Sequence, residues 1–173
     1  GVKPPNIRDL GEFGSKANDS RLRQTIEELE ELVCLCESDG AIWPVGDLFI
    51  HLGLFEYQFG LPDEAATYIK QGLTYNTFNT YNSPPDEQEL RLLCELYVAD
   101  ALSNSSKWKN KAPQAYKDLA RKCDAQIASA NNTLRLASDD LSGFGGSMSQ
   151  MVAKNWKAVA ESILKKIPEN YKE

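Results

Sequence analysis

The sequence has very little histidine and cysteine, and this shortage excludes several classes of enzyme. Its 173 residues contain one histidine, His51, and four cysteines, Cys34, Cys36, Cys94 and Cys123. One histidine cannot supply the paired histidines of an HExxH zinc site or of a di-iron helix bundle. Cys34 and Cys36 are separated by a single residue, whereas zinc ribbons and redox sites use a C-x-x-C spacing. We therefore expect no metal, no cofactor and no catalytic residues.

Long apolar runs are missing as well. The best candidate, residues 48–55, lies between Asp47 and Glu56 and is interrupted by His51. It is far shorter than the roughly 18 to 20 apolar residues that a membrane-spanning helix needs. The chain also lacks the basic excess of a nucleic-acid-binding domain, since 19 Lys and Arg face 25 Asp and Glu. We expect a cytoplasmic protein that binds neither membranes nor nucleic acid.

The cysteine positions favour free thiols over disulfides. Cys36, Cys94 and Cys123 fall on apolar positions of helical patterns, and Cys34 lies beside one, so we expect buried thiols. A secreted helical protein with two disulfides stays open as an alternative. It would require Cys34 or Cys36 to meet Cys94 or Cys123, and three Asn-x-Ser/Thr sites give it weak support.

Apolar residues at helical spacing are what the sequence does contain. They recur every three or four residues in six segments, and no run alternates long enough to predict a strand. We predict an all-α fold in which residues 1–17 form an extended arm and residues 18–173 a single helical domain. The glycines and serines of residues 138–149 predict a flexible loop. The expected helices are residues 19–38, 43–59, 62–73, 86–101, 115–130 or 115–136, and 148–167.

Bulky and small residues in the second and third expected helices have a distinctive order. They are Phe49, Leu52, Gly53, Gly60, Ala65, Ile69, Gly72 and Leu73. Gly53 would let the third helix approach closely, Gly60 would permit the turn, and Ala65 would be the small residue at the crossing. With these residues, the stretch 46–79 resembles a tetratricopeptide repeat, a helix pair of about 34 residues.

A second, irregular copy can be started near residue 87. Leu90, Leu93, Cys94 and Tyr97 follow the same order, although this copy begins too late for strict periodicity. In the first copy, Glu56 stands where the family usually has an aromatic residue. An ordinary six-helix bundle therefore stays open beside a divergent helical repeat. In the repeat interpretation, the last helix packs as a cap over the end of the stack.

The resemblance implies a protein-interaction module or adaptor rather than an enzyme. In that family the first helix of each pair lines a groove that binds a partner peptide or helix. The alternative is a small helical bundle with a ligand pocket or an enzymatic role. The positions that would face the groove are Asp47, Ile50, Leu54, Tyr57 and Gln58, with Gln88, Arg91, Glu95, Val98 and Ala99 in the second pair.

Charge is distributed unevenly along the chain. Residues 1–86 carry six basic and fourteen acidic groups, whereas residues 87–173 carry thirteen and eleven. Lys107, Trp108, Lys109 and Lys111 form a basic patch around an aromatic ring, a combination that can hold an acidic peptide. We expect the patch to dock an acidic partner segment or, by self-association, the acidic half of a second copy. A solvated helix start with a buried tryptophan stays open as the alternative.

Overall fold

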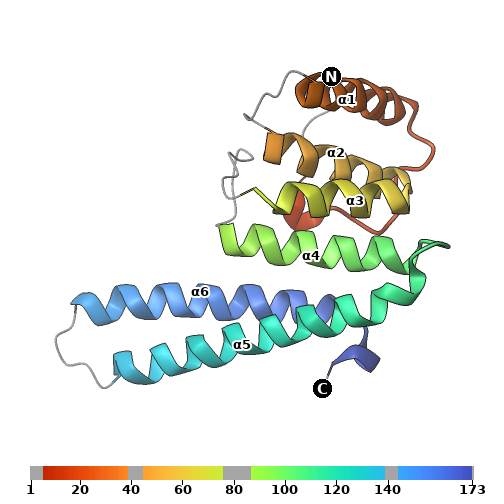
Figure 1. Cartoon of the computed structure of the whole chain (residues 1–173). Coiled ribbons are helices and arrows are strands. Elements are labelled where there is room, and N and C mark those ends of the chain that lie inside the picture. Colours follow the sequence, from red (N-terminus) through yellow and green to blue (C-terminus); the bar gives the residue numbers. More distant parts are fainter. Residues whose placement is uncertain (1–5, 39–44, 76–86, 139–143, 173) are drawn as a thin grey trace. The chain divides into compact units, whose positions relative to one another are not determined.

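The computed structural model describes residues 6–38, 45–75, 87–138 and 144–172, and these residues form α-helices and short turns without any strand (Figure 1). The predicted all-α fold is confirmed. None of the described helices is long and apolar enough to cross a membrane. The expected helix starts at Trp43–Pro44 and at Asp86 lie outside the described residues. The helices are α1 (Ser20–Ser38), α2 (Val45–Phe59), α3 (Pro62–Leu73), α4 (Glu87–Ser103), α5 (Ala112–Ser138) and α6 (Phe144–Lys166), with 3₁₀ turns η1 (Ile7–Asp9), η2 (Lys109–Lys111) and η3 (Glu169–Tyr171).

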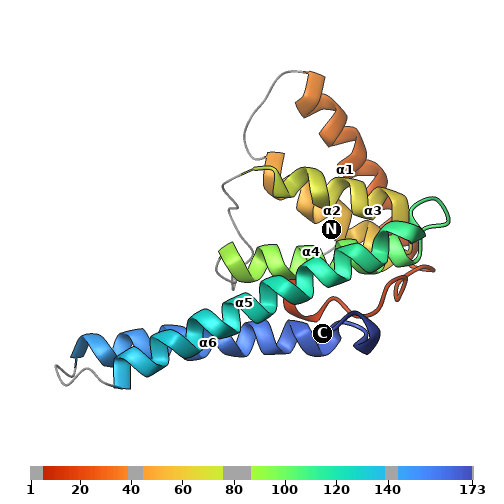
Figure 2. The same ribbon diagram turned by 60° about the horizontal axis from the view of Figure 1, so that its bottom comes forward.

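The chain divides into two compact units, residues 1–115 and 116–173. In the first unit, α1 packs on α2, α2 on α3 and α3 on α4 (Figure 1). In the second unit, most of α5 and all of α6 run side by side (Figure 2). The Gln126 side-chain amide donates a hydrogen bond of 2.8 Å to the carbonyl oxygen of Trp156, which joins these two helices.

The apolar stripe of α1 forms a core with α2. Leu22, Ile26 and Val33 are buried against a cluster on α2 that includes Phe49 and Leu52. Each such side chain contributes about 1.5 to 3 kcal/mol when it is fully buried. Asp19 caps the N-terminus of α1, because one of its carboxylate oxygens accepts hydrogen bonds of 3.0 and 3.1 Å from the amides of Arg21 and Leu22.

Helices α2 and α3 approach each other closely at a glycine. A Cβ atom on Gly53 would lie 2.6 Å from Cγ1 of Ile69 and 3.2 Å from the carbonyl oxygen of Ala65. The turn between the helices has Gly60 at φ +96°, and the amide of Leu61 donates 2.9 Å back to the Glu56 carbonyl. This is the left-handed glycine cap that ends many helices. The predicted roles of Gly53, Gly60 and Ala65 are confirmed.

The predicted loop at residues 138–149 is wrong at its C-terminal side. Helix α6 begins at Phe144, so residues 144–149 are helical. The loop prediction depends on Gly145 and Gly146, because glycine costs about 1 kcal/mol relative to alanine in a helix. The rest of α6 overrides this cost, since Ala153, Ala160 and Ile163 are buried along one side.

The cysteines are all free thiols, but they are not all buried. Cys94 and Cys123 are buried, Cys36 is half-buried and Cys34 is exposed. The expectation of a buried thiol is therefore wrong for Cys34. The reason is its position on α1, where buried Val33 faces the core and the next residue turns about 100° away from it.

Candidate binding site

The basic patch comes shortly after α4 in the chain. Hydrogen bonds through Ser105 hold it next to the start of α3. The Ser105 hydroxyl donates to the Asp63 carboxylate in the first turn of α3 and accepts a 3.0 Å hydrogen bond from the Trp108 amide. Ser105 is buried, so this link is protected from water. As a result, the segment that carries Trp108 is held against α3.

Two lysines of the patch lie over the Trp108 ring. The ammonium nitrogen of Lys107 is 4.8 Å from the ring centroid and that of Lys111 is 5.8 Å from it. Both distances are within the range of cation–π attraction. The lysines are exposed and the ring is half-buried, so the ring is partly available to a ligand. Lys109, the third lysine of the patch, is also exposed.

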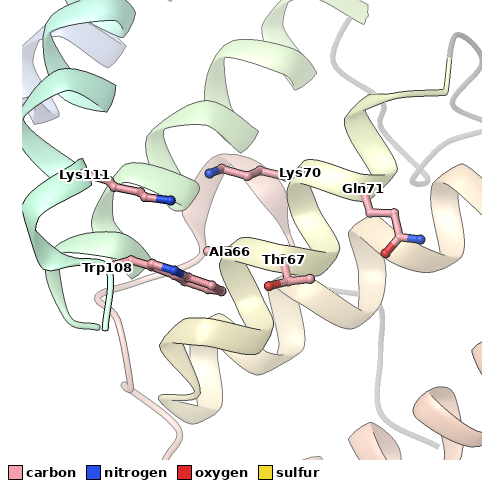
Figure 3. Close-up of a pocket in the computed structure, with 6 residues that line it drawn as sticks. All are labelled: Ala66, Thr67, Lys70, Gln71, Trp108 and Lys111. Carbon is pink, nitrogen blue, oxygen red and sulfur yellow. The ribbon is translucent and has the colours of Figure 1, made fainter. Parts of the chain in front are cut away.

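A pocket of about 310 Å³ lies between the patch and α3 (Figure 3). On the α3 side, the pocket is lined by Lys70, which lies one helical turn after Ala66. Figure 3 shows the ammonium ends of Lys70 and Lys111 pointing toward each other above the Trp108 ring. The pocket is lined by Ala66, Thr67, Lys70, Gln71, Trp108 and Lys111.

The two converging lysines give this pocket a positive potential. Within the part of the chain that the structure describes, neither Lys70 nor Lys111 forms an ion pair. Like charges that converge on one space repel each other, and an anion between them relieves that repulsion. The geometry is therefore suited to a carboxylate or another anionic group next to an aromatic surface.

The residues predicted to line a groove on α2 and α4 are mostly not at the surface. Only Gln88 is exposed, while Asp47, Arg91 and Glu95 are half-buried. The other predicted groove residues are buried, and a binding role for the set stays a prediction. These buried residues are Ile50, Leu54, Tyr57, Gln58, Val98 and Ala99.

Contacts within the first unit account for several of these positions. A Cβ atom on Gly72 of α3 would lie 2.7 Å from Cγ1 of Ile50, so Ile50 packs on α3. The Arg91 guanidinium donates hydrogen bonds of 3.1 and 3.0 Å to the carbonyl oxygens of Leu73 and Tyr75. Arg91 therefore closes the C-terminal end of α3.

Glu56 has the most strongly raised pKa among the carboxylic acids that the structure describes in the first unit, and it lies outside the pocket. Its side chain is fully buried and neither carboxylate oxygen accepts a hydrogen bond. Burial, followed by the charges of Glu30 on α1 and Glu64 on α3, raises the pKa of Glu56 to about 9. Its protonated form can donate to the Glu30 carboxylate, a hydrogen bond that raises the pKa further. Glu56 is thus a neutral acid at pH 7.

His51 and the other candidate ligands form no metal site in the described residues. Burial lowers the pKa of His51, which favours its neutral form. No group of three or more His, Cys, Asp or Glu side chains in the described segments could hold a metal ion.

Sequence reasoning missed Lys70, which completes the pocket. Lys70 lies on the exposed side of α3, far from the patch in sequence, and no local motif links it to Lys111. The buried link from Ser105 to Asp63 is what brings the two segments together. Residues 107–111 could be found from sequence because three lysines and a tryptophan fall in five consecutive positions.

Comparison with known proteins does not identify the site. No protein-family model, curated protein or solved structure matches the chain. The function of the pocket therefore has to be inferred from its own residues and from the helices that carry them.

Proposed function

We propose that the chain is a non-enzymatic protein-interaction module that binds an acidic segment of a partner protein at the pocket between α3 and the basic patch. One observation carries the proposal: the ammonium groups of Lys70 and Lys111 converge above the Trp108 ring without an ion pair in the described residues. A carboxylate of the partner would lie between the two lysines.

The size of the pocket is compatible with part of a peptide. Pockets for drug-sized ligands span about 300 to 1,000 Å³, and this one, at about 310 Å³, lies at the lower end. It has room for one or two side chains. An acidic residue would pair with the lysines, and a neighbouring apolar or aromatic residue would pack on Trp108. The rest of the peptide would stay on the surface.

The helix-pair architecture also supports an interaction role. Helices α2 and α3 cross closely at Gly53 and Ala65, the pattern for which residues 46–79 resemble a tetratricopeptide repeat. Paired helices of this kind stack into scaffolds that present a surface to partner proteins. Here the proposed contact surface comes from α3 and the segment after α4 instead of the predicted groove.

Charge reversal at the pocket tests the proposal. The probe is a fluorescein-labelled peptide with four glutamates around one phenylalanine, titrated into the intact chain and followed by fluorescence anisotropy. Lys70→Glu with Lys111→Glu should weaken binding about tenfold or more, because each lost exposed ion pair is worth roughly 0.2 to 1 kcal/mol and repulsion is added. Binding to the unmodified chain should weaken as salt rises, because salt screens exposed charges.

A matched control separates the pocket from net charge. Lys165→Glu with Lys166→Glu changes the charge equally at exposed positions near the end of α6. This variant should keep at least half of the affinity. Equal losses in the two double variants would show that the peptide responds only to overall charge. An unchanged affinity in the Lys70 and Lys111 variant would remove the pocket as the site.

A further inference from the structure

The N-terminal arm is bound to α2 and α4 in the way that proteins bind a separate peptide. Its described part, residues 6–17, contains η1 and runs beside α4 (Figures 1 and 2). Ile7 and Leu10 are buried, with 2% and 3% of their surfaces exposed. Phe13 packs edge-to-face on Tyr57, with ring centroids 5.4 Å apart. These three apolar residues are spaced three apart and anchor the arm.

Side chains of the two helices hold the main chain of the arm. The Tyr97 hydroxyl donates to the carbonyl oxygen of Ile7, and the Gln58 amide donates 3.2 Å to that of Leu10. Burial raises the pKa of Tyr97, which keeps its hydroxyl protonated as a donor. Both acceptors are main-chain carbonyls, so these two contacts hold the backbone of the arm whatever its side chains are.

The end of α2 completes the main-chain contacts. The amide of Gly14 donates 2.9 Å to the carbonyl oxygen of Tyr57, and the amide of Lys16 donates 2.8 Å to that of Gln58. These carbonyls belong to the last turn of α2, where helical carbonyls lack partners inside the helix. The arm therefore satisfies acceptors that a bound peptide could equally satisfy.

A charged contact adds sequence specificity. The Arg8 guanidinium binds the Glu89 carboxylate of α4 through two hydrogen bonds, of 2.8 and 3.1 Å. The Glu89 side chain is 12% exposed and that of Arg8 is 43% exposed. A paired, forked contact of this kind distinguishes arginine from other residues.

We infer that the face formed by Tyr57, Gln58, Glu89 and Tyr97 is a receptor for linear peptides, and that the N-terminal arm is its resident intramolecular ligand. The recognised pattern has three apolar residues spaced three apart, with an arginine directly after the first. A partner segment with this pattern competes with the arm for the face. This receptor is distinct from the basic pocket and does not depend on the function proposed for it.

The arm is part of the same chain as the face it covers, so it would compete with any partner peptide for that face. A tethered ligand faces its site at an effective concentration of about millimolar, so an added peptide competes poorly with it. Weakening the arm by mutation should make the face available. The same peptide in solution should then bind it.

The test uses the intact chain and a fluorescein-labelled peptide of residues 6–18. The peptide should bind a Leu10→Asp chain at least tenfold more tightly than the unmodified chain, by fluorescence anisotropy. The same peptide carrying Leu10→Asp should bind neither chain. A control chain with Leu136→Asp, an exposed position on α5, should bind like the unmodified chain.

Two further measurements keep the inference open to refutation. Arg8→Glu changes a partly exposed residue and should also increase peptide binding, by about threefold or more. If the Leu10→Asp chain loses its helical circular dichroism, it has unfolded. Peptide binding by the Arg8→Glu chain is then the measurement that tests the inference. No gain in a folded variant overturns the inference. An unmodified chain that sediments as a dimer and is dissociated by the peptide also overturns it, because the arm would then occupy a second copy.

Discussion

Gly53→Val is expected to lower the free energy of unfolding by about 3 kcal/mol or more. The first added carbon would lie 2.6 Å from Ile69 and within 3.2 Å of the α3 backbone at Ala65, so the helices would have to separate. Overpacking of a tight core typically costs about 1 to 3 kcal/mol, and here backbone as well as side chain has to move. Urea denaturation followed by circular dichroism measures the change.

A valine at an exposed site of α3 provides the control for Gly53→Val. Glu64→Val introduces the same β-branched side chain into a helix at an exposed position, and should change stability by no more than about 0.5 kcal/mol. If the two variants are equally stable, the close approach of α2 and α3 at Gly53 is not what holds this pair together.

Glu56 should make the folded chain less stable as the pH rises. The folded chain keeps a proton on Glu56 up to about pH 9, whereas an ordinary glutamate loses it near pH 4.5. Between these values the folded state binds one more proton than the unfolded state, so the free energy of unfolding falls with increasing pH. Glu56→Gln stays neutral at every pH, so relative to the unmodified chain it should gain up to about 1.4 kcal/mol of stability for each pH unit between these two values.

The measurement for Glu56 is urea denaturation at several pH values between about 5 and 9, the range over which the two states differ in protonation. The difference in stability between the Glu56→Gln variant and the unmodified chain should widen steadily as the pH rises. Glu31→Gln, at an exposed position of α1 whose charge is not among those that raise the pKa of Glu56, should leave the slope in place. Parallel curves for the unmodified chain and Glu56→Gln would mean that Glu56 does not hold its proton in the folded state.

Local sequence signals are enough to predict most of the helices. Helix α3 can be predicted almost entirely from its own residues. Pro62 lies in its first turn, Ala65 and Ile69 form its buried stripe, and Gly72 is a small residue at the crossing. The apolar spacing also predicts the position of α4 in the sequence, but it does not predict how many sides of this helix are buried. The buried residues of α4 include Leu92, Leu96 and Val98 in addition to the predicted stripe, so it is buried on more than one side.

Two of the predicted groove positions on α4 are buried, and spacing alone does not show this. The groove prediction includes Val98 and Ala99 because of their spacing alone, and both are buried. Burial of this kind depends on tertiary packing, which a spacing argument does not contain.

The candidate sites are partly predictable for similar reasons. The lysines of the basic patch are neighbours in sequence, but Lys70 joins them only through the fold. The prolines and glycines of the arm predict an extended segment. The spacing of Ile7, Leu10 and Phe13 is an available sign that the arm packs on other elements, although no local rule specifies the tyrosines of α2 and α4 as their partners.

Amide chemical-shift mapping of the intact chain tests the central claim most directly. The glutamate–phenylalanine peptide is titrated into ¹⁵N-labelled protein, and the shifts of every backbone amide and tryptophan indole are followed. The pocket predicts the largest shifts at Thr67, Lys70 and Lys111 and at the Trp108 indole, and their loss in the Lys70→Glu, Lys111→Glu variant. Shifts that spread over α5 and α6, or that persist unchanged in that variant, would contradict it.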